Sequence, residues 1–158
     1  MGLINQLEVA QPVVQSARAH VEQWLDRLNS ALQIADQTSV ASLFALDGHW
    51  RDLFAFTWNI TPCQGPDAIA ALMVEKQATV KAQGFAIAEG RTPPRRVQRA
   101  GVDVIEAIFC FETSVGRCFG VLRLLANETA KAFQVSTNLH ELKGFEEKIG
   151  ERRPTGEA

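Results

Sequence analysis

One carboxylate, Asp52, lies in a strongly aromatic part of the chain and is the side chain best suited to proton-transfer chemistry. It belongs to the segment HWRDLFAFTW, and four aromatic residues occupy the positions that alternate in phase with it: Trp50, Phe54, Phe56 and Trp58. In a strand, alternate residues point to the same face, so these rings would surround the carboxylate. Burial among apolar groups disfavours the charged form, which suits a base that removes a proton next to a carbonyl. Asp52 is therefore a candidate general base.

A structural role accounts for the same residues. Asp52 could accept hydrogen bonds from Arg51, from Arg123, from an indole N–H or from the backbone of a loop, while the aromatic side chains form ordinary core. An isomerase would also need a donor for the developing oxyanion, and the chain contains no tyrosine that could provide one. The sequence leaves both roles open.

The other nucleophilic and metal-ligating residue types form no recognisable motif. The histidines, His20, His49 and His140, are dispersed without HExxH or paired Cys/His spacing, so no metal site is expected. The cysteines contain no CxxC pair, which favours reduced thiols over a disulfide framework. Cys110 and Cys118 could face each other across a hairpin as small buried hydrophobic residues.

Charged residues in the second half of the chain favour structural pairing. Glu106 and Glu112 share one face of a predicted strand but lie roughly 20 Å apart along it, too far to act on one bond. They are expected to pair with cations on neighbouring strands: Arg117, Arg123 or Lys131. The basic segment RTPPRRVQR, residues 91–99, could hold a phosphate or carboxylate, but it has no interleaved aromatic residues for stacking nucleic acid bases. A solvated loop at a sheet edge is the favoured interpretation.

Helices must form one wall of any pocket around Asp52. Apolar residues repeat at spacings of three and four over residues 13–35, which predicts a long amphipathic helix, followed by a short one capped by Asp36 or Thr38. A further helix is predicted over residues 67–83, because Pro66 suits a first helical turn. Together with the aromatic segment it would line an apolar pocket with these residues: Trp50, Asp52, Phe54, Phe56, Trp58, Ile69, Leu72 and Met73.

Strands supply the other wall. The aromatic alternation predicts a strand over residues 49–58, followed by a turn over residues 59–66. Three longer strands are predicted at residues 102–114, 117–126 and 130–142, and their short connections favour antiparallel hairpins. Helices followed by such a meander predict an α+β fold, a cone-shaped barrel of curved antiparallel sheet covered by N-terminal helices.

The late strands are apolar on both faces, as the first of them illustrates. Along it, Ile105 and Phe109 alternate with Val104 and Ile108. One face can pack against the helices, but the other also needs cover. We therefore expect a two-fold homodimer.

Composition and charge narrow the class of protein. The chain has 158 residues, 46% of them hydrophobic, which predicts a single domain over residues 1–142 with a polar tail or linker at residues 143–158. A net charge of -2 gives no general attraction to nucleic acid or anionic membranes. The dispersed cysteines and the lack of a secretory segment favour the cytoplasm, and no apolar run approaches the roughly 20 residues that span a bilayer.

The order of elements resembles the nuclear transport factor 2-like (SnoaL-like) superfamily. A closer resemblance is carried by particular segments: FALDGHWRDLFAFTW followed by GPDAIAALM, and later NLHELKGFEEKIGERRPTG. They are similar to the N-terminal domain that precedes the flavin-containing monooxygenase module in some bacterial and fungal proteins. The WRD segment also resembles the position of the general-base aspartate of ketosteroid isomerases in the superfamily. The resemblance implies a dimeric cone with an apolar pocket.

The chain lacks what a monooxygenase needs. It has no GxGxxG between a strand and a helix, so neither a flavin nor a nicotinamide nucleotide has its usual phosphate cradle, and no cofactor is expected. The hypothesis is a small-molecule-binding or dimerisation/docking domain that binds a small apolar molecule and is associated with a flavoprotein oxidoreductase in the same or another chain. The alternative is a small isomerase, dehydratase or cyclase with Asp52 as general base.

Overall fold

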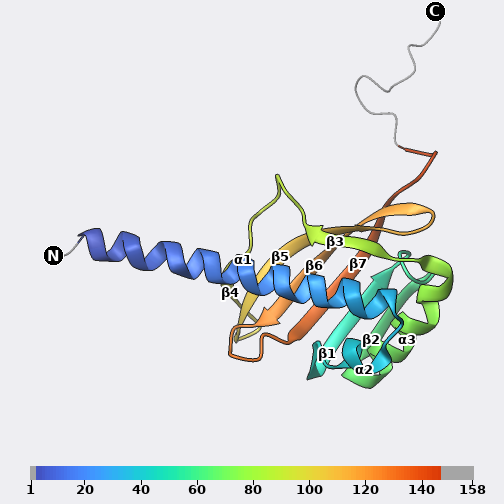
Figure 1. Cartoon of the computed structure of the whole chain (residues 1–158), viewed down its shortest axis with the longest axis horizontal. Coiled ribbons are helices and arrows are strands. Elements are labelled where there is room, and N and C mark those ends of the chain that lie inside the picture. Colours follow the sequence, from blue (N-terminus) through green and yellow to red (C-terminus); the bar gives the residue numbers. More distant parts are fainter. Residues whose placement is uncertain (1–2, 147–158) are drawn as a thin grey trace, which may run out of the picture.

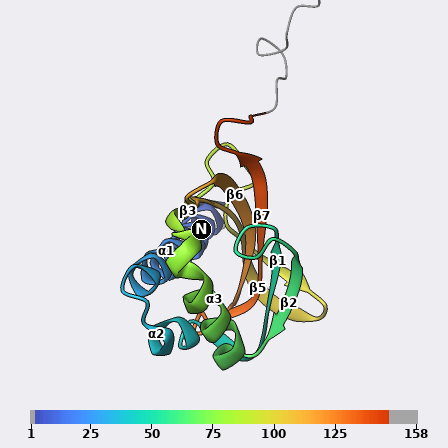
Figure 2. The ribbon, with the colours of Figure 1, turned by 90° about the vertical axis from the view of Figure 1, so that its right-hand side faces the viewer.

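Helices gather on one face of a curved sheet, as Figures 1 and 2 show. The computed structural model describes residues 3–146, with side chains described from residue 17 onward. Within this range the elements follow in the order α1 (Leu3–Gln33), α2 (Gln37–Ala41), β1 (Phe44–Leu53), β2 (Ile60–Gln64), α3 (Pro66–Val80), β3 (Gln83–Ile87), β4 (Arg95–Arg99), β5 (Val102–Glu112), β6 (Gly116–Leu125) and β7 (Ala132–Leu142). The last part of the predicted tail, residues 147–158, lies outside the described residues.

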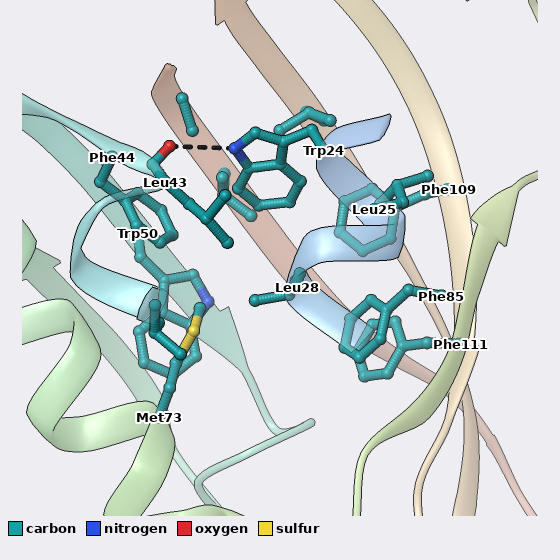
Figure 3. Packing of buried hydrophobic residues seen from close by; sticks show 14 of the residues in the cluster. Trp24, Leu25, Leu28, Leu43, Phe44, Trp50, Met73, Phe85, Phe109 and Phe111 are labelled. Carbon is teal, nitrogen blue, oxygen red and sulfur yellow. Dashed lines mark hydrogen bonds between the residues drawn. The ribbon is translucent and has the colours of Figure 1, made fainter. Parts of the chain in front are cut away.

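The long N-terminal helix is confirmed, and α1 begins ten residues earlier than the predicted start at residue 13. Its apolar repeat faces the sheet, with five side chains at most 3% exposed: Val21, Trp24, Leu25, Leu28 and Leu32. The indole Nε1 of Trp24 donates a hydrogen bond of 2.9 Å to the Leu43 carbonyl, as drawn in Figure 3. Asp36 caps the short helix α2, since its Oδ1 accepts from the Ser39 amide at 3.2 Å.

The sheet runs in the order β2-β1-β7-β6-β5-β3, with β4 also paired to β5. The three late strands are antiparallel neighbours, as predicted, whereas β1 pairs with β7 in parallel. The parallel pair joins the N-terminal half of the chain to the C-terminal meander. The result is an α+β fold with a curved, open sheet. No helix in the described range is long and apolar enough to cross a bilayer.

The predicted bounds of the first strand are wrong. β1 begins at Phe44 rather than at His49 and ends at Leu53. A register shift against β7 falls between Phe44 and His49, so the Asp47–Gly48 pair lies at an irregularity inside the strand. At the other end, Phe54 adopts a φ of 63°, a left-handed conformation that breaks the strand despite the continuing aromatic alternation.

Two segments predicted as irregular are strands. Residues 60–64 form β2, which lies at the edge of the sheet, where Pro62 can be tolerated because an edge strand need not use every N–H. Within the basic segment, Arg95–Arg99 form β4, antiparallel to β5. Each of these short strands pairs with a longer neighbour: β2 pairs with β1, and β4 pairs with β5.

Aromatic side chains fill the space between the helices and the inner face of the sheet, the face turned toward the helices. Phe85 of β3 stacks on Phe111 of β5 with ring centroids 4.5 Å apart. The close-up in Figure 3 shows this stack together with Trp24 of α1 and Trp50 of β1. Gly120 of β6 leaves room for Phe109, because a Cβ atom at that glycine would lie 2.2 Å from the ring. The inner face is thus a packed core.

Candidate functional site

Asp52 is fully buried, 0% exposed, beneath the loop that joins β1 to β2. Its Oδ1 accepts from the Phe56 amide at 3.0 Å and from Thr137 Oγ1 at 2.6 Å. Its Oδ2 accepts from the Phe56 amide at 3.0 Å, the Thr57 amide at 2.7 Å and Thr57 Oγ1 at 2.9 Å. A carboxylate offers about four lone-pair sites, so these donors use its capacity. The carboxylate holds the loop in one conformation.

A polar chain through the core ties Asp52 to the last strand. Trp50 Nε1 donates to Thr137 Oγ1 at 2.9 Å, and that hydroxyl donates onward to Asp52. Asp52 and Thr137 are register partners in the parallel pair of β1 and β7. Of the structural partners considered from the sequence, the loop backbone contacts Asp52 directly and the indole reaches it through Thr137. No hydrogen bond in the described range joins it to Arg51 or Arg123.

The eight residues predicted to line a pocket lie in different environments. Four are in the packed core, each at most 3% exposed: Trp50, Phe56, Ile69 and Met73. Leu72 is partly buried and packs against that core. Phe54 and Trp58 lie at the surface, 45% and 68% exposed, because the strand ends before them. Asp52 is therefore surrounded by Trp50, Phe56 and its threonine partners rather than by four aromatic rings.

A groove of about 650 Å³ lies on the outer face of the sheet, the face turned away from the helices. Four strands line it, β1, β2, β6 and β7. Its walls carry His49, Arg51, Gln64, Arg123, Gln134 and Ser136, with apolar contributions from Pro62 and Val121. No Asp or Glu residue is among its lining residues. The groove is therefore a concave, hydrogen-bonding surface of positive charge.

Glu106 organises the charges beside the groove. Its carboxylate accepts from Arg99 Nε at 2.9 Å and from Arg123 Nε at 2.8 Å, and Arg95 lies 3.6 Å away. The hydrogen bond from Arg99 lowers the pKa of Glu106 from 4.5 to about 2, burial opposes the shift, and the bond from Arg123 adds to it. The predicted pairing of Glu106 with Arg123 is confirmed. Arg123 also donates through Nη1 to Gln134 Oε1 at 2.5 Å.

The basic segment is not a free anion cradle. Arg96 pairs with Asp103 at 3.1 Å, and Arg99 pairs with Glu106. The guanidinium of Arg91 lies over the Phe119 ring, 4.7 Å from its centroid. These arginines have partners within the chain.

The side chains of Cys110 and Cys118 lie in different environments. Cys118 faces inward opposite Phe111, whereas Cys110 faces outward opposite Phe119, so the expected facing of the two thiols is wrong. Strands alternate sides, and the hairpin register places the two thiols on opposite faces. Burial raises the pKa of the Cys118 thiol to about 12. Within the described range, no three His, Cys, Asp or Glu side chains gather as metal ligands would.

Most groove residues were not recognised from the sequence as functional. Gln64, Gln134 and Ser136 are uncharged and far apart in the chain, and Pro62 made its segment resemble a turn. One signal was available: in β1, β6 and β7 the outward-facing positions carry polar residues such as Arg51 and Arg123 among apolar ones. That signal has meaning only once the order of strands is known.

Comparisons with solved structures support the fold. An NTF2-like protein with a cystatin-like fold from Novosphingobium aromaticivorans is 15% identical, with a TM-score of 0.57 and coverage of 88% of this chain and 91% of that one. A domain of unknown function with a cystatin-like fold from Nostoc punctiforme is 11% identical, with a TM-score of 0.57 and coverage of 80% and 78%. A proposed isomerase from Bacillus subtilis is 12% identical, with a TM-score of 0.53 and coverage of 78% and 88%.

At these identities the likeness concerns the fold alone. The neighbours share the nuclear transport factor 2-like, cystatin-like arrangement of helices on a curved sheet. No protein-family model and no curated protein matches the chain.

Proposed function

We propose that this domain is a non-catalytic dimerisation and docking module that pairs with a second copy through the outer face of its sheet. The observation that carries the proposal is a block of half-buried apolar side chains on that face, the outer strip, formed by Ile108, Cys110, Phe119 and Val121. Cys110 pairs with Phe119 and Ile108 with Val121 across β5 and β6, so the four form one contiguous surface. Contiguous exposed apolar surface of this kind marks interaction sites.

Charge favours an identical copy as the occupant. A two-fold contact brings the same patch against itself, so unpaired like charges near its centre would repel. Three arginines around the outer strip are paired within the chain. Arg99 and Arg123 bind Glu106, and Arg117 binds Glu141 at 3.1 Å. These three arginines are therefore already neutralised beside the strip, and the guanidinium of Arg91 packs on the Phe119 ring at one end of it.

Light scattering after size exclusion tests this proposal. The wild-type chain is expected to have the mass of a dimer, and Ile108→Asp the mass of a monomer with an unchanged circular dichroism spectrum, because a carboxylate at the strip centre would be buried without a partner. Ile34→Asp is the matched control, since Ile34 follows α1 and is 74% exposed, so this variant should remain dimeric. A wild-type monomer at every concentration would contradict the proposal.

The proposed docking partner of the module is a flavoprotein oxidoreductase, in the same or another chain. The support is the resemblance of the segments around Asp52 and after Asn138 to the domain that precedes flavin-containing monooxygenases. Affinity capture of the domain from its source cells should retain a second polypeptide in fixed ratio, with the visible absorption of bound flavin. A captured fraction without flavin would remove this partner from the proposal.

The alternative is an enzyme in which Asp52 acts as a general base on a small apolar molecule. The observation in its favour is the burial of this carboxylate beside Trp50 and Phe56, and a neighbour in fold is a proposed isomerase. Against it stands the hydrogen bonding of Asp52, because a base must release a donor before it can take a substrate proton. We therefore favour the dimerisation and docking function over catalysis by Asp52.

A further inference from the structure

The outer-face groove adjoins the outer strip and shares Val121 with it, but most of its lining differs in chemistry. The strip is apolar, whereas the groove is lined by hydrogen-bonding side chains from β1, β2, β6 and β7. Its volume of about 650 Å³ lies within the range of small-molecule sites, roughly 300 to 1,000 Å³. The charges that line the groove indicate which class of small molecule it can bind.

The charge of the groove has one sign. Arg51, Arg123 and His49 line it, and no acidic residue does, in a chain whose net charge is -2. Glu106 does not line the groove; it lines the small pocket next to it, where it pairs with Arg123 and is shared with Arg99 and Arg95. Arg123 is therefore paired with a carboxylate beside the groove, whereas Arg51 has no ion pair with any described residue.

Arg123 is held in position for a ligand. Its Nε donates to Glu106 at 2.8 Å and its Nη1 donates to Gln134 at 2.5 Å. Within the described range no hydrogen bond engages Nη2. A guanidinium fixed at two nitrogens loses little freedom when the third binds an oxyanion, and a planar donor of this kind suits carboxylates and phosphates.

Arg51 of β1 supplies a second cation, which has no ion pair in the described range and is separated from Arg123 of β6 by β7. Arg51 is exposed. It is the register partner of Ser136 in β7, and Ser136 in turn is the partner of Val121 in β6. The Ser136 hydroxyl accepts from the Val121 amide at 3.3 Å, which leaves its own proton available for donation. The two arginines and this hydroxyl face the same groove.

We propose that the outer-face groove binds a small organic carboxylate, with the carboxylate held by Arg51 and Arg123 and the apolar part of the ligand against Val121 and Pro62. Charge-assisted hydrogen bonds from two arginines give the site its preference for an anion. Gln64 and Ser136 are placed to bind further polar groups of the ligand. All of its lining residues come from one chain, and Val121 is shared with the outer strip, so the apolar end of the site lies at the edge of the proposed dimer contact.

A nuclear magnetic resonance titration with benzoate, succinate, inorganic phosphate and the uncharged analogue benzamide tests this proposal. Benzoate or succinate is expected to saturate, with shifts centred on the groove, and benzamide to bind at least roughly tenfold more weakly. Arg51→Gln should weaken carboxylate binding roughly tenfold. Arg51 is exposed and unpaired, so this variant should fold normally. Arg123→Gln should weaken binding at least as much.

Arg27→Gln is the matched control, because Arg27 is exposed on α1, on the helical side of the molecule, and should leave binding unchanged. Three results would overturn the proposal. They are the absence of saturable binding for both carboxylates, equal binding of benzoate and benzamide, and undiminished binding by Arg51→Gln. Saturation by inorganic phosphate without either carboxylate would show an adventitious ion only, and would overturn it as well.

Discussion

At the scale of single residues, Asp52 shows how one buried carboxylate can hold the backbone of a loop. The buried carboxylate joins three parts of the chain. It binds two amides of the loop after β1, the hydroxyl of Thr57 in the same loop and the hydroxyl of Thr137 in β7. Buried polar groups stabilise a fold when each is satisfied, and the cost of leaving one unsatisfied is large. The loop that carries Phe54 and Trp58 at the surface is therefore fixed from below.

Asp52→Asn should destabilise the fold. An amide nitrogen in place of one carboxylate oxygen would face the donors at Phe56 and Thr57, and each buried donor left without an acceptor costs about 1 to 3 kcal/mol. We expect the free energy of unfolding in urea to fall by about 2 to 4 kcal/mol. Asp47→Asn is the control, because Asp47 is exposed on the same strand and should change stability little.

The same variant tests the enzymatic alternative. If Asp52 were a base, the wild-type chain would catalyse exchange of protons next to the carbonyl of an apolar ketone in heavy water, and Asp52→Asn would abolish that exchange while Asp47→Asn kept it. A docking module is expected to show only the solvent rate for all three proteins. Unchanged stability in Asp52→Asn would contradict the structural role assigned to its hydrogen bonds.

At the scale of elements, periodicity predicted α1, α3 and the three late strands, because each has a long repeat with one dominant spacing. Periodicity failed to predict the strand bounds where the backbone conformation of a single residue ends or permits a strand. Phe54 continues the aromatic alternation of β1 but takes a left-handed conformation, and no pattern of apolar residues reports a φ angle. Pro62 suggested a turn because its tolerance in β2 depends on an edge position that only the sheet order reveals. The loop backbone was considered as a partner of Asp52, but the Thr137 hydroxyl was missed because it is distant in sequence.

Ion pairs to Glu106 join β4, β5 and β6, so the free energy of unfolding should decrease as the pH becomes acidic. The folded pKa of about 2 lies below the ordinary value of 4.5, so the stabilising contribution is complete above the ordinary value and is lost as pH falls toward 2. Glu106→Gln should therefore lower the free energy of unfolding by about 1 to 3 kcal/mol near neutral pH. The difference from wild type should shrink as pH falls.

Urea unfolding at a series of pH values checks this expectation. Glu128→Gln serves as the control, because Glu128 is exposed in the turn between β6 and β7 and has no ion pair in the described range. A stability difference between Glu106→Gln and wild type that is independent of pH would show that packing, rather than charge, sets the role of this side chain.

At the scale of the whole molecule, the two faces of one sheet differ in what covers them and in their composition. The inner face is closed by the helices and filled by aromatic side chains, as the end-on view in Figure 2 and the close-up in Figure 3 show. The outer face carries the apolar strip on β5 and β6 and the cationic groove beside it on β6, β7, β1 and β2. Sequence alternation predicted that this face needs cover. It did not predict the groove, which depends on strands brought together from both ends of the chain.

The parallel pairing of β1 with β7 also has a consequence for how the chain folds. The hydrogen-bonded residues Asp52 and Thr137 are 85 positions apart, whereas β5, β6 and β7 are joined by short hairpins that form between near neighbours. Contacts between distant residues are slow to form because the entropy of closing the loop must be lost first. The meander is therefore expected to assemble early, with β7 as a temporary open edge until β1 arrives. During that interval the edge can pair with another unfinished chain, so aggregation during refolding should compete most strongly with this late step.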